Sequence, residues 1–172
     1  NFRFTMSDLT TLKIAHGDLH GGNILVNEAG ETKLVDYDTM YVPELAGLTS
    51  SEIGQPNYQH PQFHFPAPAT RPFNEKMDRF SALVIYTSLR AVAADPSLWD
   101  RFHNDDNLII DGQRDLTDPD NSEVFTALAE SKDPVVRKLA VKLADYAYGE
   151  ADDVPPLETV VKQATGKAKP TP

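Results

Sequence analysis

The sequence predicts a mainly helical α+β domain with one small β-hairpin, and three observations support this. Residues 77–94 are apolar on all sides, which predicts a buried central helix. Residues 24–35 contain two short β-prone runs around a turn rich in Asn and Gly, which predicts a hairpin. Residues 134–148 place apolar side chains on one helical face behind an Asp-Pro start, which predicts a second long helix.

The N-terminal half around the hairpin contains one more helix and a long irregular stretch. Met6, Leu9 and Leu12 fall on one face of a first helix. Residues 39–73 contain six prolines and little periodicity, and such a long irregular segment is more often functional than idle. Asp95 stands before a proline and therefore ends the central helix.

The C-terminal half contains short helices and an acidic loop region. Short helices are expected over residues 97–102, 122–129 and 157–163. Trp99 is expected to anchor the first of these, and residues 104–120 form an acidic, turn-rich excursion. The small polar residues 167–172 predict a disordered tail, so one domain is expected over residues 1–166.

Composition excludes several classes of protein. The chain has 172 residues with 40% hydrophobic content, enough for one cooperative core. It has no cysteine, which excludes disulfides, thiolate chemistry and cysteine-bound zinc. The net charge of −10 opposes binding to nucleic acid. The longest apolar run, residues 82–94, is too short for a bilayer and no signal peptide opens the chain, so we expect a cytoplasmic protein without a membrane partner.

The strongest functional signal is the string HGDLHGGN at residues 16–23, followed after the hairpin by Asp36. Phosphoryl transfer needs hard oxygen ligands for Mg²⁺ and a carboxylate near the attacking hydroxyl. Asp18, Asn23 and Asp36 supply these groups. Because a hairpin folds back on itself, Asn23 and Asp36 are expected at the same end, where they can share one or two cations.

These residues resemble the C-terminal lobe of the protein kinase-like superfamily, whose catalytic loop reads H-R-D-x-x-x-x-N and whose metal-binding segment reads D-F-G. The matching strings here are residues 16–23 and DYD at 36–38. GQPNYQHPQ at 54–62 resembles the substrate-facing segment that ends in A-P-E. DRFSALV at 78–84 resembles the start of the buried central helix of that lobe. The resemblance implies a kinase-like C-terminal lobe with its hairpin at the active site.

The resemblance also implies ATP and Mg²⁺ as cofactors and a serine/threonine protein kinase activity. Asp18 is then the catalytic base, Asn23 and Asp36 are the metal ligands that hold ATP, and Leu25 contacts the nucleotide. His20 is expected either to contact the transferred phosphate or to support the loop. The resemblance places the substrate with Gly54, Gln55, Pro56 and Tyr58, and it assigns His16 and Asp78 to structural support. Asp78 is expected to bond the backbone of the catalytic loop, as a buried carboxylate needs such partners.

Several positions depart from the family pattern. Gly17 replaces the arginine that receives a phosphorylated activation segment in many relatives, so no such phospho-switch is expected. Asp38 replaces the glycine of D-F-G, and it is expected to form a turn. Gln62 replaces the glutamate of A-P-E and removes the ion pair that anchors this segment in relatives.

The largest departure lies before residue 16. Residues 1–15 contain no glycine-rich phosphate loop and no helix or strand with the paired glutamate and lysine, so the N-terminal lobe is missing and this fragment alone is expected to be inactive. We expect that lobe or a partner chain to cover the hairpin. Its loss should expose Leu25 and Leu34 and favour self-association.

Three other interpretations remain open. The first is a pseudokinase or interaction module, favoured by Asp38, by Gln62 and by the missing lobe. The second is a small-molecule phosphotransferase, favoured by the H-G-D-L-H string, so the acceptor hydroxyl belongs to a protein or a small molecule. The third is that the chain is a fragment of an active kinase with no separate function. A metal site formed by His20, His60 and His64 is disfavoured, because no carboxylate pattern or helical spacing accompanies them.

Overall fold

The computed structural model describes residues 2–50, 52, 54–64 and 71–166, and the disorder predicted for residues 167–172 lies outside these. The protein is α+β and mainly helical, with a two-stranded antiparallel sheet, as the sequence predicts. Its helices and strands are α1 (Phe2–Leu12), β1 (Ile24–Val26), β2 (Thr32–Leu34), α2 (Arg79–Ala94), α3 (Ser97–Phe102), α4 (Glu123–Ala129), α5 (Pro134–Tyr148) and α6 (Leu157–Thr165).

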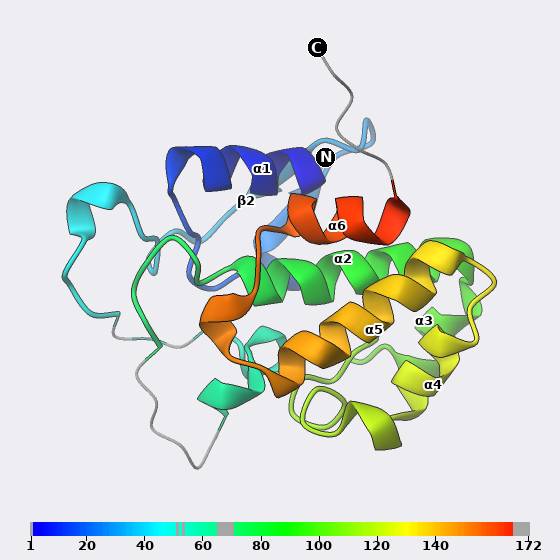
Figure 1. Cartoon of the computed structure of the whole chain (residues 1–172). Coiled ribbons are helices and arrows are strands. Elements are labelled where there is room, and N and C mark those ends of the chain that lie inside the picture. The colour runs from blue at the N-terminus through cyan, green and yellow to red at the C-terminus, as the bar shows by residue number, and fades with distance from the viewer. Residues whose placement is uncertain (1, 51, 53, 65–70, 167–172) are drawn as a thin grey trace.

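Helix α2 forms the centre of the molecule. Figure 1 shows it running through the middle, with α1 and α6 on one side and α5 on the other. Phe80, Leu83 and Ile85 are buried on different sides of this helix, which agrees with the predicted burial. The helix begins at Arg79 and not at residue 77, and Met77 lies in the turn before it, packed into a separate small cluster. Leu89 is exposed, so the burial is incomplete near the C-terminal end.

Helix α5 follows its sequence signals closely. The Asp133 carboxylate accepts a hydrogen bond from the Val135 amide at 2.8 Å, and this bond lowers the pKa of Asp133. Pro134 occupies the first turn, where its missing N–H has no partner to lose. The buried face consists of the predicted residues Val136, Leu139, Ala140, Leu143 and Ala147.

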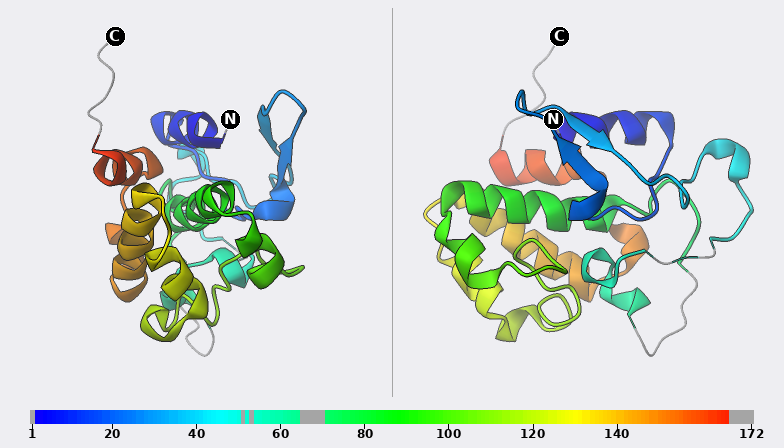
Figure 2. Two further views of the ribbon diagram at one scale, coloured as in Figure 1. Left: turned by 90° about the vertical axis from the view of Figure 1, so that its right-hand side faces the viewer. Right: turned by 180° about the vertical axis from the view of Figure 1, so that it is seen from behind.

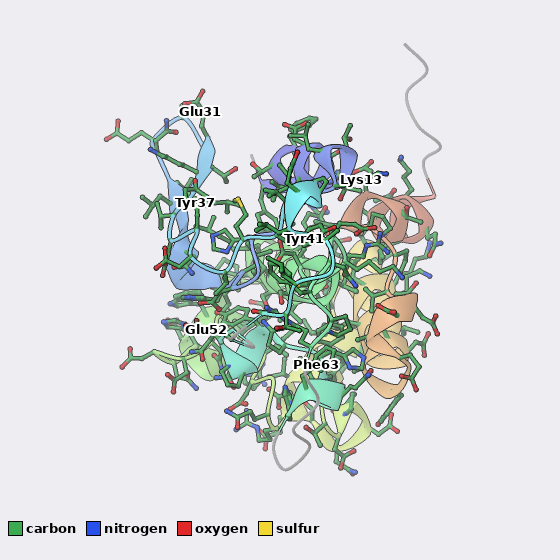
Figure 3. The ribbon with its side chains drawn as sticks, turned by 90° about the vertical axis from the view of Figure 1, so that its left-hand side faces the viewer. Lys13, Glu31, Tyr37, Tyr41, Glu52 and Phe63 are labelled. Carbon is green, nitrogen blue, oxygen red and sulfur yellow. The ribbon has the colours of Figure 1, made fainter. Side chains whose placement is uncertain are left out.

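The hairpin stands beside the helices. In the register Ile24 pairs with Leu34 and Leu25 with Lys33. Figure 2 shows the hairpin to the side of α1 and α2, and Figure 3 places Glu31 at its tip and Tyr37 near its base. Successive strand residues face opposite sides, so Leu34 turns to the core and is 5% exposed, whereas Leu25 turns away and is 53% exposed. The expectation of an exposed Leu34 is therefore wrong.

Helix α3 differs from its prediction in the residue that anchors it. Leu98 is buried, while Trp99 is 38% exposed and stacks on the His103 ring with centroids 3.7 Å apart. The expected anchor is wrong because Leu98 occupies the inward position of this short helix.

In the 39–73 stretch, the described residues form single 3₁₀ turns at Pro43–Leu45, Pro56–Tyr58 and Pro61–Phe63, and Tyr41 forms an isolated antiparallel bridge with Ala15. Each of these turns begins at a proline, whose fixed φ suits the first position of a helical turn. Within the described ranges, each helix falls short of the length or the hydropathy that spanning a bilayer demands.

Candidate functional site

Asp78 holds the 16–23 loop against the central helix. It occupies the position before α2, yet its carboxylate does not cap that helix. The carboxylate instead accepts hydrogen bonds from the backbone amides of His16 at 2.5 Å and Gly17 at 2.9 Å. Burial raises the pKa of Asp78, and the two amide bonds oppose that shift. The expected bonds between Asp78 and the loop backbone are present.

His16 connects the loop to the end of the hairpin. Its ring is fully buried, and Nδ1 accepts a long hydrogen bond from the Asp18 amide at 3.4 Å. The proton of a neutral ring therefore lies on Nε2, which donates to the Val35 carbonyl at 2.8 Å. Both nitrogens are committed to backbone groups, which is the structural support expected of His16.

Asn23 lies where the loop enters β1 and bonds both neighbouring segments. Its Nδ2 donates to the Asp18 carbonyl at 3.0 Å, and its own carbonyl accepts from the Val35 amide at 3.1 Å. No described residue donates a hydrogen bond to Asn23 Oδ1. Because residues 23 and 35 bond across the base of the hairpin, Asp36 is the next residue along the chain from the one that bonds Asn23.

Asp36 has an unusual backbone conformation. Its φ is +65°, in the left-handed region that L residues other than glycine seldom adopt. This conformation costs about 1 kcal/mol, and such strain collects at functional sites. The Asp36 side chain is exposed.

The described residues contain no group of three or more His, Cys, Asp or Glu placed to hold a metal ion. An Mg²⁺ ion here would therefore rely on the Asp36 carboxylate and the Asn23 amide oxygen. The remaining ligands would be water and phosphate oxygens, and this donor set fits the usual preference of Mg²⁺.

Asp18 lies between the loop and the 54–62 segment. Its Oδ1 accepts a hydrogen bond from the Gln55 amide at 2.7 Å. Gly54 has φ +84°, and a Cβ at this position would lie 2.9 Å from Asp18 Oδ1. Glycine therefore allows the segment to lie against the carboxylate. On the other side, His20 Nε2 is 3.6 Å from Asp18 Oδ2.

His20 has a second contact that fixes its ring. Nδ1 accepts a hydrogen bond from the Gly22 amide at 3.1 Å and so caps the short turn Gly21–Asn23. A neutral His20 therefore carries its proton on Nε2, which lies nearest the Asp18 carboxylate. His20 therefore supports the loop through its bond with the Gly22 amide and also lies beside the Asp18 carboxylate.

Tyr58 anchors the 54–62 segment. Its side chain is buried, and its carbonyl accepts a hydrogen bond from Ser81 Oγ of α2 at 2.8 Å. Burial raises the pKa of the Tyr58 hydroxyl. Pro56 is exposed and Gln55 is half-buried, so these residues are accessible near Asp18, whereas residues 57–60 are buried.

The far end of the same segment is fixed by uncharged groups. Gln62 Oε1 accepts a hydrogen bond from the Ala151 amide at 3.0 Å. His60 Nδ1 accepts from the Gln62 amide, and His60 Nε2 donates to the Tyr146 carbonyl at 2.8 Å. Burial lowers the pKa of His60. These bonds anchor the far end of the segment, and they use both His60 nitrogens, which leaves none for a metal.

Gly17 has a steric reason to be glycine. Its φ is +88°, and a Cβ there would lie 2.2 Å from the Thr39 carbonyl oxygen. Thr39 Oγ1 also donates to the His16 carbonyl at 3.0 Å, which fixes this close approach. No arginine fits at position 17.

Arg71 is the site residue that sequence reasoning missed. It is 6% exposed and donates to the Gly17 carbonyl at 2.5 Å and to Gln59 Oε1 at 2.9 Å. Burial lowers the pKa of Arg71, and the carboxylates of Asp78 and Asp18 oppose that shift. No motif or spacing in the sequence connects residue 71 with the loop.

The chain matches no known family model. No curated protein matches it either.

Proposed function

We propose that this chain supplies the C-terminal-lobe half of a protein kinase-like site that transfers the γ-phosphoryl group of ATP to a hydroxyl, most simply that of a serine or threonine. One observation carries the proposal. The Asn23 side chain bonds the Asp18 carbonyl, and the Asn23 backbone bonds Val35, the residue before Asp36. These two hydrogen bonds link the segments that carry the proposed base, Asp18, and the proposed metal ligands, Asn23 and Asp36.

Each group has a role in this reaction. Asn23 Oδ1 and the Asp36 carboxylate hold Mg²⁺, which neutralises the phosphates of ATP when bound. Asp18 orients the acceptor hydroxyl and takes its proton. The Gln55 amide already holds one Asp18 oxygen, which leaves Oδ2 for the acceptor beside His20.

The other half of the site comes from a segment or partner chain that carries the phosphate loop and its lysine. The hairpin is the surface for this partner, because each of its two faces carries an exposed apolar side chain of β1, Leu25 on one and Val26 on the other. Leu25 then contacts the nucleotide. Without this partner the same surface favours self-association.

A non-catalytic, nucleotide-binding role is the second candidate. It is favoured by the contact of Gly54 and Gln55 with Asp18, because this contact occupies one oxygen of the base with backbone.

Phosphate transfer by the intact gene product tests the proposal. Peptide and small-molecule hydroxyl acceptors are assayed with Mg²⁺ and ATP labelled at the γ-phosphate. Asp18→Asn and Asp36→Asn should each lower the rate by about a hundredfold or more. Asp38→Asn, a matched control two residues away, should change it by less than about twofold. Equal rates in all four proteins reject these roles, and Mg²⁺-dependent ATP binding without transfer supports the second candidate.

A further inference from the structure

Arg71 is a buried cation between two loops that are distant in sequence. One nitrogen, Nη2, donates to the Gly17 carbonyl, and the other, Nη1, donates to Gln59 in the 54–62 segment. We propose that Arg71 is a positioning residue that fixes the peptide before Asp18 and joins it to this segment. Its catalytic consequence rests on the function proposed above.

The peptide between Gly17 and Asp18 is held at both of its polar atoms. Its oxygen accepts from Arg71 at 2.5 Å, and its N–H donates to His16 Nδ1 at 3.4 Å. The preceding amides of Gly17 and His16 are held by Asp78. A peptide plane fixed in this way sets the direction in which the Asp18 side chain leaves the backbone.

The same guanidinium positions the neighbouring segment. A Cβ on Gly54 would lie 2.9 Å from Gln59 Nε2, 2.9 Å from Asp18 Oδ1 and 3.0 Å from the Gly17 carbonyl oxygen. Gly54 is therefore packed against three groups, two of which Arg71 bonds directly. This contact seats Gln55, whose amide donates to Asp18.

The position requires arginine in particular. Arg71 reaches two acceptors on separate segments with its planar fork, which a lysine ammonium on a single stem does not reproduce. Its charge is held in the interior by the carboxylates of Asp78 and Asp18. Because no side chain fits at position 17, the guanidinium that bonds the Gly17 carbonyl comes from another segment.

Backbone amide hydrogen exchange in the full chain tests the inference without any assay of activity. The variants are Arg71→Gln, Arg71→Lys and Gln59→Leu. The reporter amides are those of Gly17 and Gln55, with Leu139 in the middle of α5 as the internal control.

Arg71→Gln should speed exchange of both reporters by about tenfold or more. The substitution removes the charged hydrogen bonds from Arg71 to the Gly17 carbonyl and to Gln59, which hold the two loops in place. Arg71→Lys and Gln59→Leu should each speed exchange at Gln55 and leave Gly17 near its original rate. The control amide at Leu139 should change by less than about twofold. If Arg71→Gln does not fold, the other two variants decide the matter. Equal acceleration at all three amides, or no acceleration at Gln55 in both Arg71→Lys and Gln59→Leu, overturns the proposal.

The catalytic consequence has its own measurement. In the intact gene product, Arg71→Lys should lower kcat by about tenfold and leave the KM for ATP unchanged, because the nucleotide is held by other groups. If the wild-type protein transfers no phosphate but the three variants show the expected exchange rates, the proposed function is refuted and the positioning role of Arg71 stands. If the wild-type enzyme is active and Arg71→Lys leaves kcat unchanged, the catalytic consequence is refuted.

Discussion

Replacing Gly54 by alanine tests whether the 54–62 segment lies against Asp18 as described. Gly54 has φ +84°, and the exposed Gly47 has φ +89° with nothing within 4 Å of an added Cβ. The two positions therefore share the backbone strain and differ in their surroundings. Gly47→Ala is the matched control.

The magnitudes follow from that difference. Alanine in the left-handed region costs about 1 kcal/mol, up to about 2, at either position. At Gly54 the new methyl also meets Asp18, Gln59 and the Gly17 carbonyl oxygen at 2.9–3.0 Å. Overpacking of this kind costs about 1–3 kcal/mol more. Gly54→Ala should thus lower the free energy of unfolding by about 1–3 kcal/mol more than Gly47→Ala does.

Urea unfolding, followed by circular dichroism, measures both free energies. The amide exchange of Gln55 in the same samples reports whether its bond to Asp18 survives, and it should speed up only in Gly54→Ala. Two variants that lose the same stability within about 0.5 kcal/mol would refute the described packing of Gly54.

Three further changes have expected outcomes. Asp133→Ala should lower the free energy of unfolding by about 1 kcal/mol through loss of the helix cap and of the ion pair with Arg90, measured by urea unfolding against the exposed Asp145→Ala. Leu34→Ala should cost about 2–3 kcal/mol in the same measurement and Leu25→Ala under about 0.5, because only Leu34 is buried. The lowered pKa of His60 means that the unfolded chain binds the proton more readily, so stability falls as the pH drops below the ordinary value of 6.5. Below pH 6.5, His60→Gln should reduce the slope of the free energy of unfolding against pH by at most about 1.4 kcal/mol per pH unit.

Each of these expectations has a contrary result. Equal costs for Asp133→Ala and Asp145→Ala would show that the cap contributes little. Equal costs for Leu25→Ala and Leu34→Ala would contradict the register of the hairpin. A pH dependence of unfolding that His60→Gln leaves unchanged would show that this histidine is not held neutral by its burial.

Local signals in the sequence predicted much of the fold. Helix α5 is an example, because a capping Asp, a first-turn Pro and a period of 3.6 residues act within one segment. The signals for the hairpin also lie within one short segment, and they predict that residues 23 and 36 lie near each other. Leu34 was mispredicted because its burial depends on which strand face meets α1 and α2, and β periodicity alone does not specify that.

Part of the site is predictable because its residues lie close together in the sequence, and the resemblance adds the more distant Asp78 and the 54–62 segment. The 16–23 string and Asp36 are separated by one hairpin, so their spacing carries information. Arg71 reaches the same loop across more than fifty residues, and its role arises only when the chain is folded. Gly17 could be recognised as a departure from the family pattern, but the cause, the close Thr39 carbonyl, is a tertiary contact.

The central claim is that Asn23 and Asp36 jointly bind a divalent cation beside Asp18. Paramagnetic broadening by Mn²⁺ with ATP, read in the amide spectrum of the full chain, measures this directly. The account predicts that the signals of residues 22–24 and 35–37 are lost first, and that Asp36→Asn restores them while Asp38→Asn does not. Broadening centred elsewhere, for example on residues 104–120, or broadening that survives Asp36→Asn, would contradict it.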